Sequence, residues 1–268
     1  MHDALYEEMY NMETTHWWFV ARRYIILCLL ERYLYQTGGK TRVCDIGCGC
    51  GATLKALQAK YDASGMDFSE KAIEFCLRRG VKVEQGFLPD RIPFRNTEFD
   101  AILLLDVLEH LEKDKKSIIA CSKLLRPGGI MLCTVPACPF LWTKRDNFHR
   151  HKRRYKKADF AKLFEAPGLR VELLSYYSTL LFPLIAAVRI SSRLLGKDKY
   201  GPDITLPPGI FNKFFGGVFG FERYLVPLRV LPIGSSLVAV CRKISDQTQK
   251  YKQAIRRENK ADTPYLQA

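Results

Sequence analysis

An aspartate, a glutamate and a histidine follow the apolar run 101–105 in quick succession. Asp106, Glu109 and His110 are spaced i, i+3 and i+4, so on a helix their side chains would share one face. A hydroxyl group that reacts as a nucleophile gains from a base that takes its proton, and imidazole is the group most often used. The spacing predicts that His110 is this base, oriented by Glu109 or Asp106. The alternative is structural, with acidic residues favouring a helix N-terminus.

The same residue types also permit a divalent metal ion. Carboxylate oxygens and imidazole nitrogens are ordinary ligands of such ions. His149 and His151 are the candidate distal ligands, and His151 is also a candidate catalytic group. We favour the metal-free base and assign no metal ligands from the sequence.

A cationic segment follows the apolar run 130–135. Residues 144–157 contain eight Lys/Arg and one Asp, with His and aromatic residues between them. Guanidinium groups match the geometry of phosphate and carboxylate groups. We therefore predict that this segment binds a substrate that carries phosphate or carboxylate, through Asp146, His149, Arg153, Arg154 and Tyr155. The segment also suits RNA, but no recognised RNA-binding module accompanies it, and we expect no DNA partner.

Glycine alternates with cysteine in the stretch VCDIGCGCGAT, residues 43–53. A strand that runs into Asp45, Gly47 and Gly49, followed by a helix, presents backbone N–H groups to a polar ligand. Alone, the stretch also fits the dinucleotide-binding pattern G-x-G-x-x-A. Asp67 ends the second predicted strand, and its carboxylate can accept hydrogen bonds from both hydroxyls of a ribose.

The cysteines of this stretch are interpreted as small spacers rather than as a metal site. No second Cys pair or suitably spaced His nearby completes a zinc-binding set. Cys44 should point from its strand into the core. Cys48 should lie near the ligand, so we expect bound cofactor to slow its alkylation.

Apolar periodicity divides the chain into alternating helices and strands. We expect helices over 5–35, 52–60, 69–79 and 114–125, and strands over 42–46, 63–66, 81–84, 101–105, 130–135, 171–176 and 236–241. This alternation predicts an α/β fold with a parallel, doubly wound sheet. The expected parts are an N-terminal helical cap or lid at 1–40, a core at 41–176 with 234–243, an apolar insertion at 177–233 before the last strand, and a polar tail at 244–268.

The segment 177–233 is far longer than an ordinary connection and is rich in apolar and aromatic residues. Its first apolar run has twelve residues before Arg189 and contains Pro183, which is short of the ~20 residues that span a bilayer. Arg193 and Lys197 border this run. We expect either a substrate-covering element at an anionic membrane surface or a second helical layer of the core.

The composition indicates a globular protein of a reducing compartment. Hydrophobic residues make up 47% of the 268 residues and charged residues 26%, as in ordinary soluble domains. The nine cysteines are scattered and odd in number, which argues against a disulfide framework. The N-terminus lacks the pattern of a secretory signal. With a net charge of +14, we expect a cytoplasmic protein that binds peripherally at the inner face of a membrane.

Several short motifs occur in a fixed order along the chain. They are CDIGCGCG at 44–51, GMDFS at 65–69, IPF at 92–94, EFD at 98–100, LDVLEHL at 105–111 and LLRPGG at 124–129. In this order they resemble the class I S-adenosylmethionine (SAM)-dependent methyltransferases. One subgroup is similar also in HWWF at 16–19, VPA at 135–137 and HxRRY at 151–155. The resemblance implies a Rossmann-like, seven-stranded sheet and SAM as the cofactor.

The resemblance also implies a cofactor site. Asp45 and the loop backbone would hold the amino-acid end of SAM, Asp67 the ribose, and Phe68 the adenine. Many relatives have an acidic residue where this chain has Phe87, so packing and backbone contacts would have to hold the adenine here. The implied cofactor-binding residues are Asp45, Gly47, Cys48, Gly49, Asp67, Phe68, Phe87, Leu105 and Asp106.

An aromatic and a cationic residue near the N-terminus are candidate acceptor contacts. Trp18 would pack over the ligand and Arg22 would reach an anionic group, unless the tryptophan belongs to a helix–core contact. Together these features predict methyl transfer to a hydroxyl of a small or lipid-linked anionic acceptor. The alternatives are an RNA methyltransferase, a non-catalytic SAM- or nucleotide-binding protein and, as the weakest, an NAD-dependent enzyme.

Overall fold

Seven strands form the framework of the chain. They are β1 (Arg42–Ile46), β2 (Asp62–Asp67), β3 (Val83–Gln85), β4 (Phe99–Leu105), β5 (Leu125–Pro136), β6 (Leu169–Tyr177) and β7 (Ser236–Lys243). The structure is a computed structural model that describes residues 3–34, 40–94, 97–165, 168–198 and 206–244. The predicted polar tail beyond residue 244 therefore lies outside the described residues.

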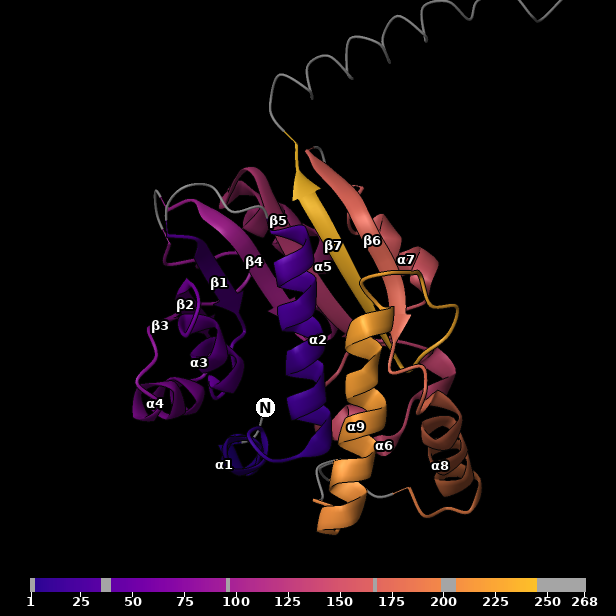
Figure 1. Cartoon of the computed structure of the whole chain (residues 1–268). Helices are drawn as coiled ribbons and strands as arrows, with labels where there is room; N and C mark the ends of the chain where they lie inside the picture. The colour runs from indigo at the N-terminus through magenta and orange to yellow at the C-terminus, as the bar shows by residue number, and fades with distance from the viewer. Residues whose placement is uncertain (1–2, 35–39, 95–96, 166–167, 199–205, 245–268) are drawn as a thin grey trace, which may run out of the picture.

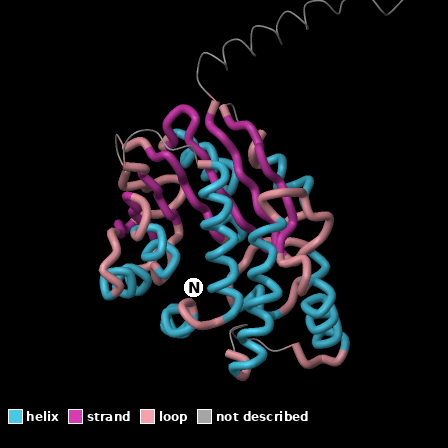
Figure 2. Tube along the Cα trace, viewed as in Figure 1, coloured by secondary structure: helices cyan, strands magenta, loops and turns pink. Residues whose placement is uncertain are grey.

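Helices connect and flank the strands. They are α1 (Asp3–Met12), α2 (Trp17–Tyr33), α3 (Ala52–Gln58), α4 (Glu70–Arg78), α5 (Asp114–Lys123), α6 (Lys144–Phe148), α7 (Lys157–Lys162), α8 (Phe182–Leu194) and α9 (Gly209–Leu225), with 3₁₀ turns η1 (Leu108–His110) and η2 (Pro139–Leu141). The strands form one sheet of order β3-β2-β1-β4-β5-β7-β6 with helices on both faces (Figures 1 and 2). This confirms the Rossmann-like, seven-stranded α/β fold.

The last strand departs from the expected parallel sheet. β3, β2, β1, β4 and β5 pair in parallel, but β7 runs antiparallel to both β5 and β6. Ser236, the first residue of β7, pairs with Pro136 and Tyr177, the last residues of β5 and β6. The connection through α8 and α9 stays at the side where β6 ends (Figure 1). Because β7 starts at that edge, it has to run back through the sheet.

Alternate residues of each strand face opposite sides of the sheet. Val43 and Leu103 belong to a buried cluster with residues of α2, α3 and α9, whereas Cys44 and Ile102 belong to a second cluster with residues of α5 and α7. Cys44 is fully buried, which confirms that it points into the core. Both faces of the sheet are therefore closed by helices, which leaves the carboxyl edge of the parallel strands for a site.

The single helix expected over 5–35 is two helices. The His16 imidazole caps α2 by accepting a hydrogen bond from the Trp18 N–H at 3.2 Å. α1 packs on α4, where the rings of Tyr10 and Phe75 stack with centroids 4.4 Å apart. The break between the helices therefore turns α1 back toward α4 and the loop after β1.

The segment 177–233, predicted as an insertion, contains α8 and α9. α9 packs along α2, and its Phe219 is completely buried. α8 has no fully buried residue. Within the described ranges, no helix is long and apolar enough to cross a bilayer. One side of α9 thus belongs to the core, and much of the remaining surface of the two helices faces solvent.

Replacing Phe219 tests the core role of α9. We expect Phe219→Ala to lower the free energy of unfolding by about 3–5 kcal/mol, because it opens a cavity at a fully buried position. Phe221 is 53% exposed, so Phe221→Ala should change this free energy by less than about 0.5 kcal/mol. Urea denaturation followed by circular dichroism measures both. Equal losses in the two variants would contradict the assignment.

Candidate functional site

The loop after β1 is built from glycines in the left-handed region. Gly47, Gly49 and Gly51 have φ angles of 77°, 56° and 85°. A Cβ atom at Gly49 would lie 2.7 Å from the Cε atom of Met9, so a side chain there would displace α1. The loop therefore exposes bare backbone that a ligand can approach closely.

Asp67, at the end of β2, is oriented by this loop. Its Oδ2 accepts a hydrogen bond from the Gly49 N–H at 2.9 Å, and its Oδ1 accepts one from the Ser69 N–H at 3.0 Å. Burial raises the pKa of the carboxyl, against the lowering effect of these N–H groups. Each carboxylate oxygen has a further lone pair, so the group is held in place and can still accept hydrogen bonds from a diol.

Asp45, near the end of β1, is a buried acid with one carboxylate oxygen that has no hydrogen-bond partner among the described residues. It is 2% exposed, and this oxygen is Oδ1. Burial raises the pKa of Asp45 to about 7, although the nearby Arg22 opposes this and Asp67 adds to it. A buried carboxylate oxygen without a donor is costly, so the position suits a ligand that carries an ammonium group.

Arg22 of α2 lies against the end of β4. Its Nη2 is 2.5 Å from Oδ2 of Asp106, and its guanidinium lies 5.1 Å from the ring of Trp18. Burial disfavours the charged form of Arg22, but Asp106, Tyr177 and Asp45 together outweigh it, so the pKa of Arg22 is raised. The hydroxyl of Tyr177, the last residue of β6, is buried beside this pair and has no aligned hydrogen-bond partner in the described chain. Arg22 is thus engaged inside the protein, and its predicted contact with the acceptor stays a prediction.

Asp106 does not lie on a helix with Glu109 and His110, which corrects the expected shared helical face. Its φ is 57°, in the left-handed region, and its N–H donates to the carbonyl oxygen of Thr134 at 3.0 Å. Only Leu108–His110 form a 3₁₀ turn. The hydrogen bond to β5 therefore holds Asp106 outside the 3₁₀ turn that carries Glu109 and His110.

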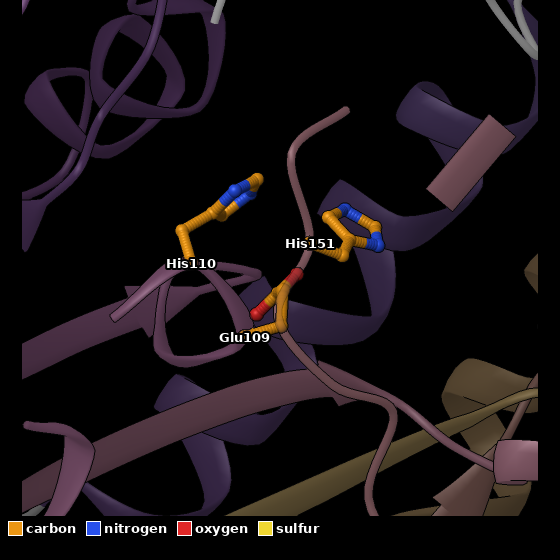
Figure 3. Close-up of side chains that lie close together, drawn as sticks. All are labelled: Glu109, His110 and His151. Atoms are coloured by element: carbon orange, nitrogen blue, oxygen red, sulfur yellow. The ribbon is translucent and has the colours of Figure 1, made fainter. Parts of the chain in front are cut away.

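A close cluster at the carboxyl edge of the parallel strands consists of Glu109, His110 and His151 (Figure 3). One ligand atom from each lies within 4.8 Å of the others. Glu109 is buried, and both of its carboxylate oxygens lack a hydrogen-bond partner in the described part of the chain. Burial and the charge of Asp106 raise the pKa of Glu109 well above its usual value. Burial and the neighbouring His151 and His149 lower the pKa of His110 to about 3, so its ring is uncharged at neutral pH.

A backbone contact brings His151 to the cluster. The N–H of Lys152 donates to the carbonyl oxygen of Glu109 at 2.8 Å. The Nδ1 of His151 lies 3.0 Å from Oδ1 of Asp146, which leaves Nε2 for another partner. His149 stacks on His151 with ring centroids 5.7 Å apart.

Asp146, predicted to bind the acceptor, is surrounded by internal partners, and its contact with the acceptor stays a prediction. Arg154 Nη2 lies 2.8 Å from its Oδ1, and Arg189 Nη1 lies 3.1 Å from its Oδ2. Burial acts to raise the pKa of Asp146, but His151 and the two arginines outweigh it, so its pKa is well below the usual range. Its role here is to orient His151 and to fix the segment 144–157.

Two further predicted acceptor residues share a second internal acid. Arg153 Nη1 donates to Oδ2 of Asp114 at 2.8 Å, and the Tyr155 hydroxyl donates to the same oxygen at 2.8 Å. Two of the eight cations of 144–157, Arg153 and Arg154, are therefore paired with acids of the protein itself. Acceptor binding by His149, Arg153, Arg154 and Tyr155 stays a prediction.

The remaining predicted cofactor residues differ in exposure. Phe68 and Phe87 are largely exposed, whereas Leu105 and Cys48 are buried. The Cys48 Sγ lies 3.8 Å from the Sγ of Cys76, and the pKa of Cys48 is raised well above its usual value by that contact and by burial. The thiol therefore points into the core, and we expect it to react slowly even without cofactor.

The sequence profile of the methyltransferase domain family matches residues 19–174. The chain belongs to this family. It is a class I SAM-dependent methyltransferase, and the family implies the use of SAM, whose sulfonium carries the transferred methyl group. The unpartnered Asp45 oxygen suits the ammonium group of SAM, and the oriented carboxylate of Asp67 suits its ribose diol. These two residues and the Gly47–Gly49 backbone would hold the cofactor.

Named relatives of this methyltransferase match over part of its length. The ubiquinone biosynthesis O-methyltransferase of Bordetella avium is 34% identical over 95 residues, which cover 33% of this chain and 39% of that protein. A Mycolicibacterium smegmatis protein named as a probable S-adenosylmethionine-dependent methyltransferase is 28% identical over 163 residues, covering 59% of this chain and 61% of that protein. The chain thus spans less than two thirds of the length of these relatives.

A solved structure supports the fold. The methyltransferase in complex with the Trm112 activator of Haloferax volcanii has a TM-score of 0.58, covering 91% of this chain and 96% of that chain at 18% identity. At this identity the likeness shows the fold alone.

The structure adds residues to the site that sequence reasoning missed. Thr134 holds the backbone of Asp106, Tyr177 lies beside Arg22, and Met9 covers the glycine loop. Thr134 and Tyr177 lie near the carboxyl ends of strands, which was a usable signal. Met9 had none, because its position depends on the break between α1 and α2.

Removing the Asp67 carboxylate tests the cofactor site. We expect Asp67→Ala to weaken binding of S-adenosylhomocysteine by about tenfold or more, because it removes charged hydrogen bonds to the ribose. Asp62→Ala, at the half-buried start of the same strand, is the matched control and should bind normally. Isothermal titration calorimetry measures both. Unchanged binding in Asp67→Ala would show that the cofactor site lies elsewhere.

The pKa of Asp45 predicts a pH dependence. Because it is raised from 3.8 to about 7, the folded state binds this proton more tightly, and the stability contributed by Asp45 is lost as pH rises toward 7. Binding of a ligand with an ammonium group should strengthen as pH rises, because it needs Asp45 in its ionised, carboxylate form. We expect S-adenosylhomocysteine to bind about tenfold more tightly at pH 8 than at pH 6. Asp45→Asn should flatten this profile, and a profile unchanged in that variant would contradict the assignment.

Proposed function

We propose that this chain transfers the methyl group of SAM to a hydroxyl of a small or lipid-linked anionic acceptor. The observation that carries the proposal is the cluster of Glu109, His110 and His151 at the carboxyl edge of the sheet. The charges of Asp106 and Arg22 reach Glu109, so the cluster adjoins the cofactor residues. The Bordetella avium relative is named an O-methyltransferase, which supports oxygen as the methylated atom.

The chemistry demands two things of the protein. Methyl transfer from a sulfonium is an in-line displacement, so holding the two reactants in line supplies much of the rate. The acceptor hydroxyl also has to lose its proton, and either a base or a cation can promote this. The same cluster could supply the base, and His110 in that role stays a hypothesis.

Two observations support a divalent cation at the cluster. Both oxygens of the buried Glu109 lack a partner in the described chain, so a cation would satisfy a group that is costly to leave alone. The Nδ1 of His151 is bound to Asp146, which is the outer partner that metal-binding histidines usually have. We propose that Glu109, His110 and His151 hold this cation, which would lower the pKa of the hydroxyl.

The nature of the acceptor is inferred from charge and apolar surface. The net charge of +14 favours an anionic molecule. The many exposed aliphatic and aromatic residues of α8 and α9 favour one with an apolar part. A lipid-linked hydroxyl compound with a phosphate or carboxylate combines both properties.

RNA is the second candidate acceptor, and the structure gives it less support than the sequence does. Arg153 pairs with Asp114, and Arg154 pairs with Asp146. The Nζ of Lys152 lies 2.6 Å from Oε1 of Glu112. Fewer cations of 144–157 therefore remain for phosphates. RNA recognition would require binding that weakens steeply with salt.

A labelling experiment tests the proposed function. The purified protein and methyl-tritiated SAM are incubated with the lipid, small-molecule and RNA fractions of a bacterial extract. We expect label in the lipid or small-molecule fraction, in a methyl ether that resists mild base. Label confined to RNA, or no labelled product from a protein that binds S-adenosylhomocysteine, would contradict the proposal.

Metal titration tests the cation separately from activity. We expect Mn²⁺ to bind the wild-type chain, and Glu109→Gln to bind it at least about tenfold more weakly. Glu112→Gln, which changes an exposed carboxylate three residues on, is the matched control and should bind Mn²⁺ normally. Electron paramagnetic resonance counts the free ion. Absence of Mn²⁺ and Zn²⁺ binding by the wild-type chain would leave the base hypothesis and overturn the cation.

A further inference from the structure

Several of the most exposed large apolar residues that the structure describes lie at the end of α8 and the start of α9. We call this region the insertion tip; its apolar residues are Leu194, Leu195, Leu206, Ile210, Phe211 and Phe214. Leu194 is 77% exposed and Ile210 is 76% exposed. Both helix ends lie at the edge of the molecule beyond the carboxyl ends of the parallel strands (Figure 1). Such a group of exposed apolar side chains indicates a contact surface.

Cations surround these apolar residues. Arg193, Lys197 and Lys213 are exposed between and beside them. Among the described residues from 190 to 215 the single acid is Asp198, whose carboxylate accepts a hydrogen bond from the Lys144 N–H at 2.8 Å. Apolar side chains flanked by exposed cations are typical of segments that lie in the interface of an anionic membrane.

We propose that the insertion tip docks on the surface of an anionic lipid bilayer. No helix within the described ranges can span a bilayer, so the contact is interfacial. The cations also argue against a second copy of the chain as the occupant, because two such surfaces would repel each other. The headgroups of an anionic bilayer attract the cations, and the boundary between headgroups and acyl chains takes up the apolar side chains.

The tip is tied to the acceptor side of the site. Arg193 Nη1 donates to the carbonyl oxygen of Phe140 at 3.0 Å, and Arg189, one turn earlier in α8, pairs with Asp146. Asp146 in turn holds His151. Docking would therefore bring the edge that carries the cluster close to the headgroups, where a lipid-linked hydroxyl compound would enter. This last step rests on the proposed function, whereas docking itself does not.

Vesicle flotation tests the apolar part of the proposal. We expect the full chain to float with phosphatidylcholine vesicles that contain phosphatidylglycerol, and to bind pure phosphatidylcholine at least about tenfold more weakly. Ile210→Ser with Phe214→Ser should weaken anionic binding by about tenfold or more. Leu77→Ser, at a 63% exposed position of α4, is the matched control and should bind as the wild type does.

A second pair of variants tests the charges. Lys197→Gln with Lys213→Gln should weaken binding about tenfold and reduce its dependence on salt. Lys115→Gln with Lys116→Gln removes the same charge from α5 and should have little effect. Equal losses in the two pairs would indicate a general charge effect and overturn the docking surface.

Three outcomes are decisive for the inference. Absence of vesicle binding overturns it, as does concentration-dependent dimerisation that Ile210→Ser with Phe214→Ser abolishes in light scattering. Unchanged binding of the apolar variant also overturns it. Binding of S-adenosylhomocysteine is measured on every protein, so a tip variant that loses docking but still binds this ligand supports the surface. A wild-type chain that binds this ligand but not the vesicles refutes the membrane surface alone. Loss of cofactor binding in the wild type would refute the proposed function instead.

Discussion

The ion pair between Arg22 and Asp106 is the interaction on which the site depends. It joins α2 of the N-terminal cap to the end of β4, with 2.5 Å between the charged atoms. Two largely buried charges have to remain paired, because removing one leaves the other without compensation. The Arg22 charge also reaches Asp45, and the left-handed conformation of Asp106 turns the chain at once toward Glu109. The cap, the cofactor acid and the cluster therefore share one electrostatic centre.

Asp146 is a second buried acid that gathers several cations. It shows why a count of charged residues in 144–157 overestimates the positive charge that is available to a ligand. The eight Lys/Arg of 144–157 suggest a surface for anions. In the folded chain, Arg154 pairs with Asp146, and Arg153 donates to Asp114. These charges fix the loop that carries His151 rather than facing a partner. Other cations of this segment, such as Lys144, Arg150 and Lys156, remain exposed, and further exposed cations lie on the insertion. The total charge of the chain cannot separate these groups.

The sequence predicts those features that depend on local pattern. The apolar runs place the strands, the glycine spacing marks the loop after β1, and Asp67 falls at a strand end as expected. Features that depend on distant contacts were missed. The position of Asp106 follows from its bond to Thr134 on the neighbouring strand. The direction of β7 follows from where α8 and α9 lie, and periodicity along 5–35 does not reveal the break that turns α1 onto α4.

The reversed last strand also explains why the insertion tip stays exposed. In a doubly wound sheet, helices that cross between parallel strands bury their apolar sides against its faces. β7 begins at the edge where β6 ends, so α8 and α9 need not cross the whole sheet, and the end of α8 and the start of α9 extend beyond it (Figure 1). Exposed apolar side chains there raise the free energy of the chain in water unless something covers them. Arg189 of α8 pairs with Asp146, and Asp146 orients His151, so two successive contacts connect the helix that carries half of the tip to the site.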